Sequence, residues 1–427
     1  MPMRVLFTTY PEKTIFQPMV PLAWALRTAG HDVRVASQPS FAAEITQAGL
    51  TAVGVGRHQA NNWRRLQEID PDVTDSRRAG LPPPYDSAVA DETTLDPEAM
   101  RAAYRTMVDS GHKLNNFPLV PGLVEFARQW QPDLVVWEAT TYAGALAARA
   151  CGAAHARMLW SIDVFGVTRQ RFLRATGGTG PDPLAGWLGG YARKYGFEFG
   201  EDLVTGQFTV DQLPGSLSMR ADGPHYLPVR YVPYGGAATV PSWLRERPAR
   251  PRIGLTLGTS AVEQYTGYSA SVGEILHALS DLDVEVVATV AGSVQAKLGT
   301  VPGNARIVSY VPLHALAPTC SAVINHAGPG TLLTSALAGV PQLALPRDFD
   351  EPELARRAAA QGAVVSLHDG PVTGAHIREQ VVRLLDEATF GERAAALREE
   401  ILDLPAPGRL VGQLEELTVK FRTGVTR

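Results

Sequence analysis

A glycine-bearing turn in the second half of the chain carries the most informative side chain. Residues 325–331 have the sequence NHAGPGT, follow a short apolar run, and precede a helical pattern that we expect to begin at Thr331. Amides at the start of a helix carry partial positive charge, and glycine lets a phosphate group approach them closely. We therefore predict an anion site with His326 at its rim. A histidine beside glycines is also typical of a capping or packing residue, and this turn is not a P-loop.

A lone carboxylate follows an apolar run in the first half. Glu138 ends the segment LVVWE, and the carboxyl ends of parallel strands line the ligand crevice of an open α/β sheet. Beside Trp137 and Tyr142, burial would raise the pKa of this carboxyl, which suits a general base. The alternative is that Glu138 only caps the helix that begins near Thr140.

The composition limits the classes of protein to which the chain can belong. With 427 residues, two domains are expected, and a net charge of −4 gives no electrostatic footprint for nucleic acid. The 2 cysteines exclude a disulfide framework, and they are typical of core residues in a reducing compartment. No apolar run is long enough to cross a membrane, so we expect a soluble, cytoplasmic protein. No carboxylate cluster or Cys/His spacing predicts a metal.

Two series of alternating strands and helices must position these residues. The first runs from a strand at 4–8, and a second begins at 253–257 after the glycine- and proline-rich segment VPYGGAATVPSWL. Such alternation predicts an α/β protein with two doubly wound, Rossmann-like domains that face a cleft. The predicted parts are a first domain at 1–235 with an insertion at about 57–120, a linker at 236–250, a second domain at 251–405, and a closing helix at 406–427. We expect this helix to pack on either domain. The alternative, which we favour less, is that it crosses back and braces the first domain.

Several short motifs occur in a fixed order. VPL at 311–313, HAGPGT at 326–331, GVPQL at 339–343 and an acidic pair at 350–351 follow one another. This succession resembles the donor half of inverting GT-B glycosyltransferases that decorate bacterial antibiotics. The segments MRVL, VPLAWAL and AGHDV, between residues 3 and 33, resemble the acceptor half of the same family. The resemblance extends over nearly the whole chain.

The resemblance implies a dTDP-deoxysugar as donor substrate and no further cofactor. The backbone near Val311 would meet the base, and a second turn, Gly258-Thr259-Ser260, would close over the phosphates. The diphosphate would be held by His326, Gly328, Gly330 and Thr331. Asp350 and Glu351 would lie near sugar hydroxyls, although many relatives carry Asp-Gln there, so Glu351 is a departure. No metal is implied, because a helix dipole and an imidazole can offset the charge of the leaving group.

The opening loop, residues 8–17, bears on the acceptor chemistry. O-glycosylating relatives carry a basic histidine there, and alignment on Val20 puts Ile15 at that position. Glu138 is then the candidate base. A phenol is acidic enough for such a base, and its phenolate carries charge on ring carbons, so we favour C-glycosylation of an aromatic polyketide-type acceptor. Side chains that could contact the acceptor, each also typical of a core, are Tyr10, Ile15, Phe16, Trp137, Tyr142 and Trp160.

Three alternatives stay open at this point. The chain could form an O-glycoside, with water or Glu138 as base, or act as a nucleotide-sugar 2-epimerase on the same scaffold. With Ile15 at the base position, it could also be a non-catalytic sugar-nucleotide binder or partner subunit. The residues leave open the sugar, the acceptor, homodimer formation, and a helper protein bound to the first domain.

Overall fold

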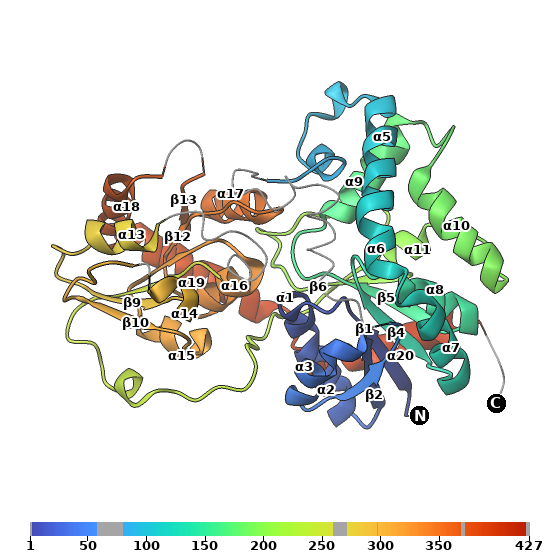
Figure 1. Ribbon diagram of the computed structural model, residues 1–427, viewed down its shortest axis with the longest axis horizontal. Helices are drawn as coiled ribbons and strands as arrows, with labels where there is room; N and C mark the ends of the chain where they lie inside the picture. The colour runs from blue at the N-terminus through green and yellow to red at the C-terminus, as the bar shows by residue number, and fades with distance from the viewer. Residues whose placement is uncertain (1, 58–79, 259–270, 297, 369–371, 424–427) are drawn as a thin grey trace.

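The computed structural model describes residues 2–57, 80–258, 271–296, 298–368 and 372–423. The chain forms two parallel sheets, one of 7 strands and one of 6, and Figure 1 shows them in two separate halves. The expected α/β class with two doubly wound domains is therefore confirmed.

The sheet of the first half has the order β3-β2-β1-β4-β5-β6-β7. Its strands are β1 (Arg4–Thr8), β2 (Asp32–Ser37), β3 (Thr51–Gly54), β4 (Leu134–Glu138), β5 (Ala154–Met158), β6 (Phe208–Asp211) and β7 (Tyr226–Pro228). β1 pairs with β4 in register Thr8↔Trp137. The opening loop after β1 and Glu138 at the end of β4 therefore lie at the same edge of the sheet.

Helices cover both faces of this sheet. They are α1 (Lys13–Phe16), α2 (Val20–Thr28), α3 (Ala42–Gln47), α5 (Pro97–Met107), α6 (Lys113–Asn116), α7 (Val120–Trp130), α8 (Ala143–Cys151), α9 (Val164–Ala175), α10 (Pro183–Tyr195) and α11 (Asp202–Thr205). One π-helical turn at Val108–His112 joins α5 to α6. The sequence predicted one helix from Pro18 to Ala29, whereas helix α1 begins earlier, at Lys13, and a 3-10 turn at Gln17–Met19 joins it to α2. Proline fits the first turn of a helix because an N–H at that position would have no partner within the helix, and proline has no N–H.

The second half has the strand order β10-β9-β8-β11-β12-β13. Its strands are β8 (Arg252–Thr256), β9 (Glu285–Thr289), β10 (Ala305–Val308), β11 (Ala322–Asn325), β12 (Gln342–Ala344) and β13 (Val364–Ser366). The helices are α13 (Val272–Ala278), α14 (Gly292–Gln295), α15 (Leu313–Leu316), α16 (Pro329–Leu337), α17 (Glu351–Gln361), α18 (Gly374–Asp386), α19 (Ala388–Asp403) and α20 (Pro407–Phe421).

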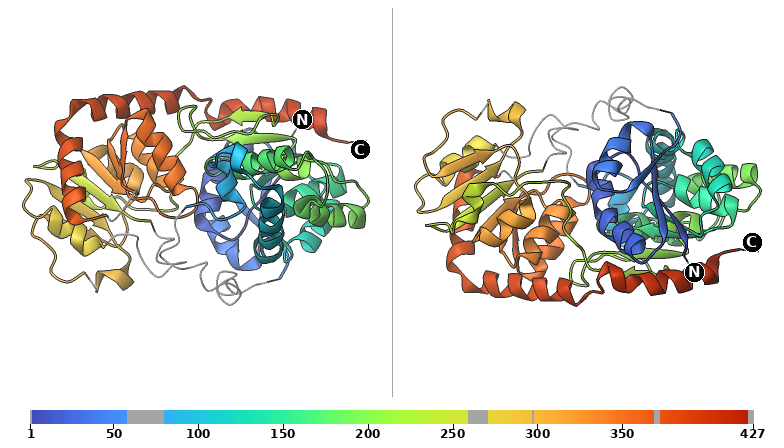
Figure 2. Two further views of the ribbon diagram at one scale, coloured as in Figure 1. Left: turned by 90° about the horizontal axis from the view of Figure 1, so that it is seen from above. Right: turned by 90° about the horizontal axis from the view of Figure 1, so that it is seen from below.

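Helix α20 returns to the first half. Figure 2 shows α19 and α20 along one side of the molecule, with α19 on the second half and α20 beside the first. His31 Nδ1 accepts a hydrogen bond from the Met3 amide at 3.0 Å, which leaves Nε2 to carry the ring proton and face Glu415 of α20 at 3.3 Å. The closing helix therefore braces the first sheet, the arrangement that the sequence analysis gave as the less favoured alternative.

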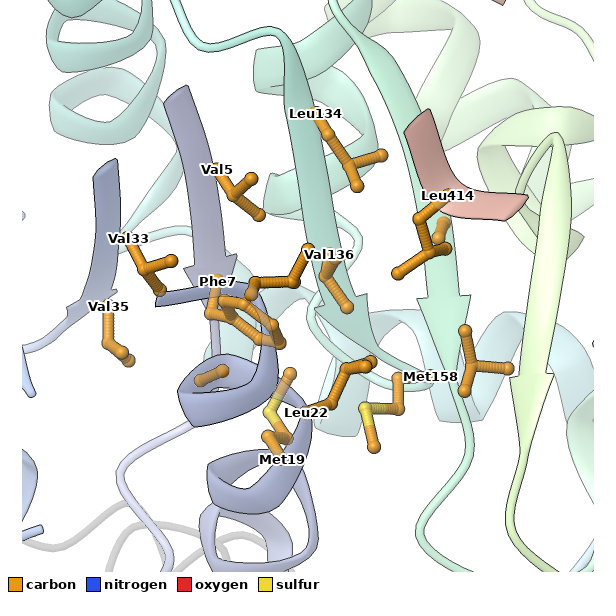
Figure 3. Close-up of a cluster of buried hydrophobic side chains, with 14 of the residues drawn as sticks. Val5, Phe7, Met19, Leu22, Val33, Val35, Leu134, Val136, Met158 and Leu414 are labelled. Atoms are coloured by element: carbon orange, nitrogen blue, oxygen red, sulfur yellow. The ribbon is translucent and has the colours of Figure 1, made fainter. Parts of the chain in front are cut away.

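The core of the first half explains why α20 docks there. Figure 3 shows Leu414 among the side chains that rise from β1, β2, β4 and β5. Leu414 is fully buried in one cluster with Val5, Val136 and Met158. Burial of such apolar surface stabilises the docked helix by roughly 25 cal/mol per Å².

Among the described residues, no helix is both long and apolar enough to cross a membrane.

Candidate active site

The turn between β11 and α16 has the local geometry of an anion site. Helix α16 begins at Pro329 with Gly328 as its N-cap, so the expected start at Thr331 was two residues late. The reason is that proline is well suited to the first helical position. Ala327 has a left-handed φ of 64°, and its amide donates to Asn325 Oδ1 at 2.7 Å. Asn325, which the sequence analysis did not single out as a site residue, therefore shapes the turn that presents His326.

The His326 ring lies between two glycines. A Cβ at Gly328 would lie 2.3 Å from His326 Nε2, and a Cβ at Gly258 would lie 2.8 Å from the same atom. Any larger residue at either position would push the ring away. Gly258 also has a φ of 79°, which other residues rarely adopt. Burial lowers the pKa of His326 to about 4, so the imidazole is neutral at pH 7.

A buried carboxylate, Asp350, and a half-buried one, Glu351, lie at the start of α17. Glu351 accepts hydrogen bonds from the amides of Arg347 at 3.0 Å and Asp348 at 2.9 Å, and its Oε1 is 3.7 Å from His326 Nε2. Asp350 accepts a hydrogen bond from the hydroxyl of Ser161, which belongs to the first half. Burial raises the pKa of Asp350 to about 6 and that of Glu351 well above its usual range. The structure thus places His326 beside Glu351, and the roles expected for His326 at the diphosphate and for the acidic pair at the sugar stay predictions.

The other expected donor residues have different surroundings. Val311 is buried in a small cluster with Leu244, Val287 and Leu316. Tyr231, which precedes the linker, reaches α16, where its hydroxyl donates to the Gly330 carbonyl at 3.2 Å. Thr259 and Ser260 lie outside the described residues. Within the described part of the chain, no three His, Cys, Asp or Glu side chains are arranged to hold a metal ion.

Glu138 is buried at the carboxyl end of β4 and has many donors. Its carboxylate accepts hydrogen bonds from the Thr140 amide at 2.8 Å, the Thr140 hydroxyl at 2.9 Å and the Thr141 hydroxyl. The backbone of Tyr10 in the opening loop also donates to it. Burial raises the pKa of Glu138, and these hydrogen bonds partly offset the rise. The carboxylate caps the turn before α8, and a catalytic role for it stays a prediction.

The predicted acceptor contacts divide into two groups. Trp137, Tyr142 and Phe16 are buried in the core: the Trp137 indole donates to His155 Nδ1 at 3.2 Å, and the Phe16 ring packs on Phe41. Tyr10, Ile15 and Trp160 are half-buried. Ile15 lies on α1, in the segment that the sequence analysis described as a loop. Contact of these six side chains with an acceptor stays a prediction.

Comparison with known proteins identifies the family. A model described as "Erythromycin biosynthesis protein CIII-like, N-terminal domain" matches residues 24–258, and the corresponding C-terminal model matches residues 273–417. The chain belongs to the erythromycin biosynthesis protein CIII-like family. It is a glycosyltransferase with the GT-B fold, as the motifs in the sequence indicated.

Relatives of this family cover nearly the whole chain. The 10-deoxymethynolide desosaminyltransferase of Streptomyces venezuelae is 44% identical in an alignment that covers 98% of each chain. The aclacinomycin-T 2-deoxy-L-fucose transferase of Streptomyces galilaeus is 41% identical, over 98% of this chain and 97% of its own. The crystal structure of the glycosyltransferase VinC in complex with dTDP has a TM-score of 0.85 and 36% identity, and covers 98% of this chain and 100% of its own.

One expectation gains no support from these relatives. Their names, which include 10-deoxymethynolide desosaminyltransferase and aklavinone 7-beta-L-rhodosaminyltransferase, describe sugar transfer without any indication of a bond to carbon, so they do not support the preference for a C-glycosidic bond. That preference rested on the absence of histidine at Ile15. The residue at position 15 bears on which group removes a proton from the acceptor. It does not determine which acceptor atom attacks the sugar.

Proposed function

We propose that this enzyme transfers a deoxysugar from a dTDP-sugar to a hydroxyl oxygen of a polyketide aglycone. The observation that carries the proposal is the neutral His326 ring at the start of α16, packed between Gly258 and Gly328, in a chain of this family. A neutral imidazole donates one N–H to a phosphate oxygen, and the Gly330 amide at the start of α16 adds the helix dipole. Together they stabilise the negative charge of departing dTDP. The Thr331 amide donates to the Gly328 carbonyl at 3.0 Å, so the predicted contact of Thr331 with the diphosphate is assigned to its side chain.

The acceptor is an aglycone of macrolide or anthracycline type. Five relatives, 38–44% identical, carry names with the sugars desosamine, rhodosamine, mycaminose and daunosamine, on acceptors that include 10-deoxymethynolide, aklavinone and tylactone. These names favour a polyketide hydroxyl, and they leave the aromatic acceptor of the sequence analysis as one of two classes. A helper protein and a homodimer stay predictions.

Glu138 is the proposed general base. The acceptor oxygen forms a bond to the anomeric carbon while the bond from that carbon to the diphosphate oxygen breaks, with inversion, and Glu138 takes the hydroxyl proton. The Tyr10 amide ties the carboxylate to the opening loop, which contains no histidine. A raised pKa brings the carboxyl closer to the pH at which it must accept a proton. The capping hydrogen bonds from Thr140 and Thr141 hold it in a fixed orientation.

Product analysis tests this function. The enzyme is incubated with a panel of dTDP-deoxysugars and both classes of aglycone, and adducts are detected by mass spectrometry. An adduct that returns the aglycone in warm acid is an O-glycoside, whereas a C-glycoside survives. An acid-stable adduct would refute transfer to oxygen. Isomerised sugar nucleotide without acceptor would indicate an epimerase, and absence of dTDP release with every acceptor would indicate a binding protein.

A further inference from the structure

The loop before α17 has a strained residue at its centre. Phe349 has a left-handed φ of 44°, although it is not glycine. Such a conformation costs of order 1–3 kcal/mol and persists only where the surroundings hold it in place. Phe349 directly precedes Asp350, the residue that the resemblance to antibiotic glycosyltransferases places near the sugar hydroxyls. The surroundings that hold Phe349 therefore also set the position of Asp350.

Those surroundings belong to the first half of the molecule. The Phe349 ring contacts three aromatic rings there, with centroid distances of 5.7 Å to Tyr85, 5.8 Å to Phe165 and 6.2 Å to Trp160. The Gly80 amide donates to the Arg347 carbonyl at 2.7 Å, and Gly80 forms a parallel β-bridge with Asp348. The first half thus holds the loop through both its backbone and its apolar side chain.

The hydroxyl of Ser161 completes this contact. Ser161 and Asp350 are both buried, with exposed fractions of 4%, and the Ser161 hydroxyl donates to Asp350 Oδ2. Ser161 lies in the loop between β5 and α9, which a buried ion pair fixes. Arg157 Nη1 donates to Asp163 Oδ1 at 3.0 Å, and the Tyr226 hydroxyl donates to Asp163 Oδ2 at 2.6 Å. The donor of the hydrogen bond to Asp350 is therefore itself held in place.

We propose that Ser161 is a positioning residue for the donor sugar. It orients the Asp350 carboxylate from the first half, while Phe349 locks the loop that carries Asp350. One oxygen of Asp350 accepts from Ser161, and the carboxylate keeps lone pairs for a sugar hydroxyl or amino group. This inference rests on the proposed function, because it takes Asp350 to contact the sugar. It adds that recognition of the sugar depends on the docking of the two halves, whereas recognition of the diphosphate depends on the second half alone.

Ser161→Ala removes only the hydroxyl and tests the inference. A hydrogen bond to a charged group contributes about 1.5–3 kcal/mol, so the KM for the dTDP-sugar should rise about 10- to 100-fold. The affinity for dTDP, measured by calorimetry, should change less than about twofold, because dTDP lacks the transferred sugar that Asp350 would contact. Ser161→Thr keeps the hydroxyl and should restore the KM. The double variant with Asp350→Asn should be no worse than Asp350→Asn alone, since the two side chains act as one unit.

Ser216→Ala is the matched control. The Ser216 hydroxyl also donates to a carboxylate across the two halves, Glu400 Oε2 of α19, at 2.6 Å. If Ser161 served only to join the halves, Ser216→Ala would also raise the KM, by less because this pair is exposed to solvent. A raised KM in Ser216→Ala, an unchanged KM in Ser161→Ala, or a parallel loss of dTDP affinity in Ser161→Ala would overturn the inference.

Failure of the proposed function itself would give a different result. Wild-type enzyme would then transfer no sugar to any acceptor. In that case the binding of dTDP-sugar and dTDP to wild type and to Ser161→Ala is compared by calorimetry. Selective loss of dTDP-sugar affinity would still support the role of Ser161, and equal affinities in the two proteins would refute it.

Discussion

Gly328→Ala should displace the His326 ring and slow sugar transfer. The added Cβ would lie 2.3 Å from His326 Nε2, well inside the 3.0 Å that real Cβ contacts respect. Gly328 has φ −56° and ψ 135°, which alanine adopts without strain, so the effect comes from the contact alone. If the ring moves off the diphosphate, a charge-assisted hydrogen bond of about 1.5–3 kcal/mol is lost. We expect kcat/KM for the dTDP-sugar to fall about 10- to 100-fold.

Gly391→Ala, on the exposed side of α19 and outside the site, is the control. A Cβ there would meet nothing within 4 Å. Kinetics with the dTDP-sugar, calorimetry with dTDP and thermal unfolding are measured for both variants. Gly391→Ala should retain wild-type kinetics, and Gly328→Ala should lose dTDP affinity while its Tm stays near wild type. Wild-type dTDP affinity in Gly328→Ala, or equal losses in the two variants, would refute the placement of His326 at the diphosphate.

Three further results are expected. Glu138→Gln should lower kcat by about 10²- to 10⁴-fold with dTDP affinity unchanged, as loss of a general base does, and near-normal kcat would remove Glu138 from the mechanism. Burial raises the pKa of Asp350 to about 6, so the carboxyl gains a proton as the pH falls through 6. The KM for the dTDP-sugar should therefore rise as the pH falls below 6. If Asp350→Asn shows the same pH-dependent rise, Asp350 is not its origin. Leu414→Ala should destabilise the protein by about 2–5 kcal/mol in denaturant unfolding, because Leu414 is fully buried, whereas Val419→Ala at an exposed position should not. Equal unfolding free energies in these two variants would contradict the docking of α20.

The local features of the site could be predicted from the sequence. Apolar runs that end in Asn325-His326 and in Glu138 predict strands whose carboxyl ends carry the chemistry, because a parallel sheet gathers those ends at one edge. Gly328 indicates that a group must approach the backbone or, as found here, that a ring must pack against it. The helix start at Pro329 was missed because Thr331 also resembles a first-turn residue.

Contacts between the halves could not be predicted in this way. Ser161 and Asp350 are separated by 189 positions, and no periodicity links a loop serine to a carboxylate in another domain. The left-handed conformation of Phe349 is imposed by the rings around it, whereas its own type predicts the opposite. The preference for a bond to carbon lacked a physical basis for a related reason: the residue type at Ile15 does not determine which acceptor atom faces the sugar.

A crystal structure with bound thymidine diphosphate would show whether the start of α16 is the diphosphate site. We expect a diphosphate oxygen within hydrogen-bond distance of the His326 ring and close to the Gly330 amide. A diphosphate bound elsewhere, or a His326 ring turned away from it, would refute this placement.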